Sequence, residues 1–282
     1  LLNIPNKAYL MASAGQHHKL NVAGLLITLG IIYGDIGTSP LYVMQAITKG
    51  KVISPELVLG GVSCVFWTLI ILTTVKYIYL ALNADNKGEG GIFALYALVR
   101  RYNAKWVIYP AIIGCATLIA DGFITPPISI SAAVEGLTIL YPNIQTVPIV
   151  IGIIIAIFAF QQVGTATVGK TFGPIMFCWF IMLGILGFFN IQMHPEVLQA
   201  VNPSYAINLL TNYPEGFWLL GAVFLCTTGG EALYSDLGHC GKQNIRFGWS
   251  FVIICLLLNY FGQAAWLLGN LNGQPIAEGQ RI

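Results

Sequence analysis

Several uninterrupted apolar stretches constrain the fold of this chain more than any other feature. Gly152–Phe160 (GIIIAIFAF) and Phe251–Leu258 are the clearest of them. A helix needs about 20 apolar residues to cross a bilayer, and the segments that reach or approach this length are 20–47, 56–82, 106–138, 145–162, 170–190, 216–236 and 246–268. The sequence therefore predicts an all-α, polytopic membrane protein with about seven spans.

The composition excludes other classes of protein. Of the 282 residues, 56% are hydrophobic and only 9% are charged, whereas soluble domains carry roughly 25% charged residues. A net charge of +2 offers no electrostatic footprint for nucleic acid. The six cysteines are scattered without a CxxC pair, which is typical of small buried hydrophobes rather than of a disulfide framework or a zinc site.

The basic residues predict the orientation, because cytoplasmic loops are enriched in lysine and arginine. With the N-terminus inside, only Lys49, Lys51 and Arg281 of the 13 basic residues would lie outside. We expect a multi-pass protein of the cell membrane (the inner membrane in a Gram-negative source) with a cytoplasmic N-terminus. The predicted regions are a cytoplasmic N-terminal segment, a transmembrane domain and an extracytoplasmic segment, at 1–19, 20–268 and 269–282.

Three carboxylates lie inside the predicted spans, although ionisable groups are costly there and by default mark function. They are Asp35 in span one, Asp121 in span three and Glu231 in span six. No arginine lies within the core of a span, and Lys76 lies near an inner end, so no countercharge is evident. We therefore favour an ion pathway over a purely structural role for these acids.

Helix-breaking residues accompany the acids of spans one and six. Gly34, Gly37 and Pro40 surround the first acid, and Gly229-Gly230 precedes the last. Unwound backbone at membrane depth persists only when it is buried in protein or lines a wet cavity, and its carbonyls can then bind a hard cation. Broken helices in corresponding places of two halves indicate the central site of an inverted-repeat transporter. We predict that helices 1 and 6 are broken.

The neighbouring side chains supply further oxygen atoms. Thr125 and Ser129 follow Asp121 at intervals of four, which places them on one helical face. An oxygen-only set without His or Cys suits an alkali ion better than a transition metal. A carboxyl group in a low-dielectric site can also take up a proton when no cation lies beside it, so proton exchange is a further hypothesis.

The stretch Gly30–Tyr42 (GIIYGDIGTSPLY) resembles the signature of the potassium uptake permeases, the Kup/HAK/KT family of the amino-acid/polyamine/organocation superfamily. Other stretches resemble the same family in the same order: Ala84–Gly91, Ile124–Pro126, Ala133–Leu137, Gly164–Lys170, Glu231–Tyr234 and Leu258–Gln263. The resemblance implies a LeuT-like inverted-repeat transporter fold, usually of twelve spans, so we expect this chain to be the N-terminal part of a longer protein.

The resemblance also implies secondary active potassium uptake by potassium–proton symport, with potassium ions, protons, the lipid bilayer and a second copy in a homodimer as partners. No cofactor and no catalytic residue are implied. The implied potassium-binding residues are Asp35, Tyr42, Asp121, Thr125, Ser129, Thr228 and Glu231. The three acids among them are the candidates for proton coupling. Asp121 replaces the glutamate of some relatives, which retains the charge but shortens its reach.

Two alternatives were weighed against this interpretation. A sodium-coupled amino-acid transporter of the same fold would bind a substrate carboxylate, which the lining acids would repel. An intramembrane aspartyl protease, the only enzyme considered, needs YD and GxGD segments on adjacent helices. Here Asp35 lies in YGDIG and Asp121 in ADGFITP. The sequence therefore favours a transporter that is not an enzyme.

Overall fold

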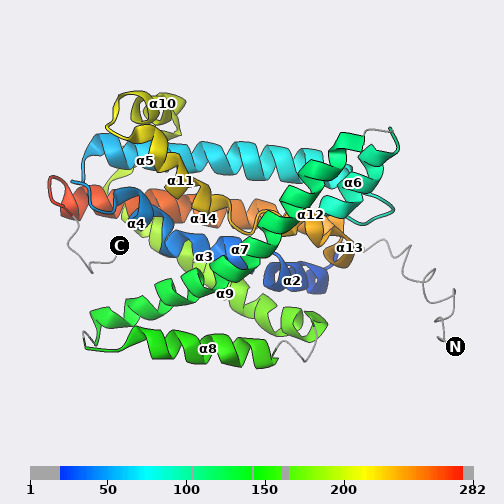
Figure 1. The fold of residues 1–282 in the computed structure, drawn as a ribbon. Helices are drawn as coiled ribbons and strands as arrows, with labels where there is room; N and C mark the ends of the chain where they lie inside the picture. The colour runs from blue at the N-terminus through cyan, green and yellow to red at the C-terminus, as the bar shows by residue number, and fades with distance from the viewer. Residues whose placement is uncertain (1–19, 103–104, 142, 161–164, 276–282) are drawn as a thin grey trace, which may run out of the picture.

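The computed structural model describes residues 20–102, 105–141, 143–160 and 165–275, and this part of the chain is helical, with isolated bridges but no strand. The predicted segment 1–19 and the residues after 275 lie outside it. Figure 1 shows α5 and α14 running alongside each other while α7 crosses the bundle obliquely. The long helices are α5 (Pro55–Thr68, continued by a π-helix over Leu69–Leu80), α7 (Ile108–Glu135), α8 (Thr146–Phe160), α9 (Thr165–Met193) and α14 (Lys242–Leu271).

Shorter helices complete the bundle. They are α2 (Val22–Ile31), α3 (Tyr33–Thr38), α4 (Val43–Thr48), α6 (Ile92–Arg100), α10 (Pro203–Asn212), α11 (Leu219–Phe224), α12 (Ala232–Ser235) and α13 (Leu237–Cys240). Local sequence explains where several helices begin. Ser54 accepts the Leu57 N–H at 3.2 Å and Asn202 accepts the Ser204 N–H at 3.0 Å, and each cap is followed by a proline, as helix starts favour.

The all-α, polytopic class is confirmed. Five helical stretches in the described residues are long and apolar enough to cross a membrane, namely 55–83, 108–138, 171–193, 216–235 and 242–271. The bent pair formed by α2 and the segment 33–41 makes a sixth. The predicted number of about seven spans is not confirmed, because 145–162 holds α8, whose 15 residues fall short of the usual length.

The first span is broken at Ile32, which the sequence did not single out, and its α-helix is interrupted again around Pro40, which the sequence did. Its two halves meet at 68° around Ile32. Gly34 and Gly37 lie inside α3, and Pro40 is tolerated because it opens a short 3₁₀ turn over Ser39–Leu41. A glycine within a helix costs only about 1 kcal/mol, which tertiary packing readily outweighs.

The sixth span is broken where the sequence predicted. Helix α11 and a 3₁₀ turn (Leu225–Thr227) end at Thr228, whose backbone is extended (ψ 132°). Gly229 then adopts φ +82°, a left-handed value that favours glycine, and α12 begins at Ala232. The predicted breaks in helices 1 and 6 are therefore both present.

Candidate ion-binding site

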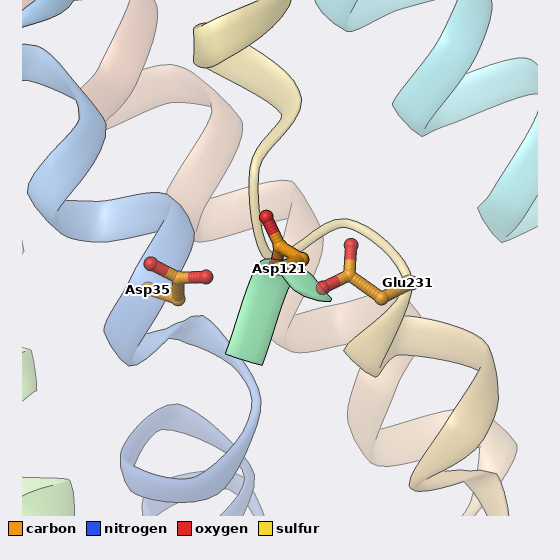
Figure 2. Close-up of side chains that lie close together, drawn as sticks. All are labelled: Asp35, Asp121 and Glu231. Atoms are coloured by element: carbon orange, nitrogen blue, oxygen red, sulfur yellow. The ribbon is translucent and has the colours of Figure 1, made fainter. Parts of the chain in front are cut away.

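The three membrane carboxylates meet in one cluster (Figure 2). Helix α3 supplies Asp35, α7 supplies Asp121, and the chain just after the break in span six supplies Glu231. One carboxylate oxygen from each lies within 4.8 Å of the others, and all three residues are partly buried. Like charges this close repel one another, so the cluster requires compensating positive charge from a cation or from protons.

No cationic side chain supplies that charge. Within the described ranges, the ion pairs are Lys51–Glu215 at 3.6 Å and His194–Glu196 at 2.9 Å, and neither involves the cluster. Both pairs lie outside the helical stretches long enough to cross a membrane. The acids are therefore not the salt-bridged structural groups that the alternative interpretation required.

The glycine at the break of span six lets this cluster form. A Cβ atom at Gly229 would lie 2.7 Å from the Asp35 Cβ and 2.9 Å from its Oδ2, closer than real Cβ atoms approach. The positive φ also disfavours any side chain at this position. Gly229 thus brings the backbone of span six directly against Asp35 and leads the chain on to Glu231.

Helix α7 holds its acid with a neighbouring hydroxyl group. Thr125 Oγ1 donates a hydrogen bond of 2.8 Å to Asp121 Oδ1 from one helical turn away. Thr125 is buried, although most of α7 is exposed within the described bundle. Pro126 and Pro127 follow within the helix and cannot donate to the carbonyls four residues earlier. The carbonyls of Gly122 and Phe123, beside the acid, therefore lack the usual helical donor four residues later.

Hydroxyl groups gather next to the carboxylates. The Tyr42 hydroxyl lies 3.3 Å from Ser39 Oγ and interacts with the side chains of Ser129 and Thr228. Ser129 Oγ in turn lies 3.1 Å from Thr38 Oγ1. Tyr42 also interacts electrostatically with the carboxylate of α3. The seven side chains predicted from the sequence thus occupy one region, as an acidic group joined to a group of hydroxyls.

A cavity of about 620 Å³ reaches the cluster from the side of α6. Asp121 and Glu231 line it, and Lys76 and Tyr77 are among its other lining residues. A water molecule takes about 30 Å³ of liquid volume, so this space can hold a hydrated ion. Asp35 is not among the residues that line this cavity.

Sequence reasoning missed Tyr77. A Cβ atom at Gly230 would lie 3.7 Å from the Tyr77 ring, which places the tyrosine against the break of span six. The ring belongs to the π-helix that continues α5. The sequence could not single out Tyr77, because it lies in an apolar run with a second tyrosine and nothing in the sequence indicates that this run forms a π-helix.

Two side-chain donors were missed as well. Trp179 Nε1 on α9 donates to the Gly37 carbonyl at 2.9 Å, and Gln263 Nε2 on α14 donates to the Pro40 carbonyl at 2.8 Å. Free carbonyls in span one were expected to serve as ion ligands, but these two accept protein donors. Gln263 could have been singled out from the sequence, because an amide side chain within an apolar helix usually forms a hydrogen bond to another helix.

Broken spans around a partly buried acidic cluster are typical of membrane proteins that move ions or polar solutes across bilayers. The family model described as "K+ potassium transporter integral membrane domain" matches residues 22–275. The chain therefore belongs to this potassium transporter family, which confirms the resemblance seen in the sequence.

Curated relatives of this chain are named as potassium transport proteins. The probable potassium transport system protein Kup of Cytophaga hutchinsonii is 62% identical over 268 residues, which cover 92% of this chain and 41% of that protein. The proteins of the same name from Flavobacterium johnsoniae and Enterococcus faecalis are 60% and 53% identical, over 92% and 91% of this chain and 41% and 40% of their own lengths. This chain thus spans about two fifths of the length of these curated relatives. No solved structure matches it.

Proposed function

We propose that the complete protein containing this chain takes up potassium across the cell membrane by secondary active transport. The observation that carries the proposal is the meeting of three carboxylates from three membrane segments, within 4.8 Å and with no ion pair to any of them among the described residues. The family and the names of the relatives favour potassium as the cargo and do not favour sodium-coupled amino-acid transport.

The proposed ligands follow from the chemistry of the cluster. Asp35, Asp121 and Glu231 supply negative charge, and Tyr42, Thr125, Ser129 and Thr228 supply neutral oxygens that can replace water around the ion. Hard alkali ions prefer such oxygen donors, and a partly buried site strengthens the attraction between the ion and the carboxylates. The breaks in spans one and six support a LeuT-like inverted-repeat fold, to which this chain would contribute the first part.

The cavity beside α6 is the proposed exit of the ion. It opens on the side that carries Lys76 and the 84–91 loop, which the distribution of basic residues assigns to the cytoplasm. An ion released by Asp121 and Glu231 would enter this hydrated space and leave inward. The cytoplasmic N-terminus and the homodimer implied by the family resemblance belong to the same proposal.

We further propose that uptake is coupled to protons, because protons would neutralise the acids whenever the potassium ion has left. Right-side-out vesicles should accumulate potassium beyond the level that the membrane potential alone sets, and a protonophore combined with an imposed potential of unchanged size should abolish this excess. Uptake that continued unaltered without the proton gradient would exclude symport while leaving the potassium site intact.

The site itself is tested with charge-neutralising variants in cells that lack other potassium uptake systems. Asp35→Asn, Asp121→Asn and Glu231→Gln should each lower rubidium or potassium uptake by at least about tenfold, equivalent to about 1.4 kcal/mol. Glu56→Gln, at an exposed acid in the first turn of α5, is the matched control and should transport normally. Normal uptake by all three cluster variants would refute the proposed site.

A further inference from the structure

We propose that Trp179 and Gln263 are positioning residues, which fix the kinked first span so that Asp35 and Tyr42 face the ion. The inference rests on the proposed potassium site and assigns to α9 and α14 a role that the site's own ligands do not have. In this view the protein, and not the bound ion, satisfies the carbonyls of Gly37 and Pro40.

We call these two donors, Trp179 and Gln263, the clamp. Its first donor, Gln263, lies on α14. The Pro40 carbonyl lies at the junction between the 3₁₀ turn and α4, which begins only at Val43, and it accepts the Gln263 amide at 2.8 Å. The same amide donates to Asn259 Oδ1 at 2.9 Å, and Asn259 Nδ2 donates to the Leu183 carbonyl of α9 at 3.2 Å. A chain of hydrogen bonds therefore runs from the Pro40 carbonyl through α14 to α9.

The second donor of the clamp, Trp179, lies on α9. The Trp179 indole donates to the Gly37 carbonyl at 2.9 Å, three residues before the carbonyl held by Gln263. A Cβ atom at Gly37 would lie 2.7 Å from the Phe180 ring, so α3 lies against α9 at this point. Two carbonyls of one short segment are thus held by two different helices.

The helices that supply these donors form a close-packed platform. A Cβ atom at Gly262 would lie 2.4 Å from the Gly187 Cα, so the backbones of α9 and α14 touch where they cross. Asn259 and Gln263 flank this crossing, with Gly262 between them in the sequence. Because the backbones of α9 and α14 are in contact, the donors that these helices carry have little freedom to move. They therefore fix the position of the segment from Gly37 to Pro40.

The clamped carbonyls are adjacent to the proposed ligands. Gly37 lies two residues after Asp35, and Pro40 lies two residues before Tyr42. One carboxylate oxygen of Asp35 lies on the side of the other two acids (Figure 2). The Gly37 and Pro40 carbonyls instead accept donors from α9 and α14. Loss of either donor should therefore shift the two ligands relative to each other and alter how the site fits an ion of a given radius.

The test compares transport by variants of the complete protein. Gln263→Met removes the amide at similar size, and Trp179→Phe removes the indole N–H while retaining an aromatic ring. Each should raise the half-saturating potassium concentration by up to about tenfold, the scale of one buried hydrogen bond, and should change the ratio of potassium to rubidium uptake. The control is Asn270→Ala, whose exposed amide donates only to the Trp266 carbonyl within α14, and this variant should behave as wild type.

A double variant tests the chain of hydrogen bonds. Asn259→Leu should reproduce the change in half-saturation, and its combination with Gln263→Met should be no worse than Gln263→Met alone, because both act on the same carbonyl. If Gln263→Met yields no protein in the membrane, Trp179→Phe decides the question by itself.

The outcomes separate this inference from the proposed function. Wild-type half-saturation and selectivity per transporter molecule in Gln263→Met and Trp179→Phe would overturn the clamp, even if the amount of protein fell, because that result indicates a structural role alone. If Asp35→Asn also transported normally, the potassium site itself would be wrong. If Asp35→Asn failed while both donor variants remained normal, the site would stand without the clamp.

Discussion

The two broken spans achieve a similar result by different means. The break in span six is held by its own chain, since the Gly230 N–H donates to the Thr227 carbonyl at 2.8 Å and the Ala232 N–H to the Gly229 carbonyl at 3.2 Å. In span one, other helices hold the half that follows the bend, because Trp179 and Gln263 donate to the Gly37 and Pro40 carbonyls. One break is therefore a local turn, and the other is maintained by tertiary packing.

This difference teaches where each break is encoded. A positive φ and a pair of glycines specify the turn of span six wherever the chain is placed. The 68° bend of span one occurs at Ile32, with no glycine or proline at the bend itself. Its determinants lie far away in the sequence, on α9 and α14. Substitutions should accordingly affect span six through local backbone strain and span one through its neighbours.

The largest effect is expected for Gly229→Ala. The left-handed conformation costs an L-residue about 1–2 kcal/mol, and the new methyl group would overlap Asp35. We expect uptake to fall by at least about tenfold, because the backbone can no longer approach the acid. Gly221→Ala, in the same span and with nothing within 4 Å of its Cβ position, should retain uptake. Normal transport by Gly229→Ala would show that this turn is not required.

A smaller effect is expected for Gly187→Ala, which acts on span one indirectly, through the packing of α9 against α14. Its Cβ atom would lie 2.2 Å from the Leu258 carbonyl oxygen, so α9 and α14 must separate. Overpacking of this kind costs about 1–3 kcal/mol and should lower the apparent melting temperature in detergent together with uptake. At Gly184 the nearest atom would be Cys255 Sγ at 3.5 Å, an ordinary contact. Equal melting temperatures for Gly187→Ala and Gly184→Ala would contradict the close crossing.

The smallest effect is expected for Tyr33→Phe at the bend itself. The buried Tyr33 hydroxyl donates to the Ile245 carbonyl at 2.5 Å and ties the second half of span one to α14. Its loss should destabilise the protein by about 1 kcal/mol, seen as a modest fall in melting temperature. Tyr79→Phe, at an exposed tyrosine of the π-helix, serves as the reference. An unchanged melting temperature in Tyr33→Phe would mean that packing alone maintains the bend.

Much of the candidate site was predictable from particular residues. Asp35, Asp121 and Glu231 were identified because a carboxylate in an apolar span is costly in any fold. Gly229-Gly230 predicted the break of span six because its determinants are local. The prediction that Gly34 and Gly37 break the helix was wrong, because both lie inside α3. The low helix propensity of glycine is a weak effect, and tertiary packing outweighs it here.

The sequence by itself determined that this protein is a helical bundle in a membrane, with acids and hydroxyls placed in apolar surroundings, because hydrophobic length and charge are properties of the chain alone. Only the tertiary structure decided that three acids distant in the sequence meet, that span one bends at Ile32, and that Trp179 and Gln263 hold the carbonyls of Gly37 and Pro40 beyond this bend. The physical reason is that these features depend on contacts between helices, and a donor's partner is defined by the packing that brings the two together.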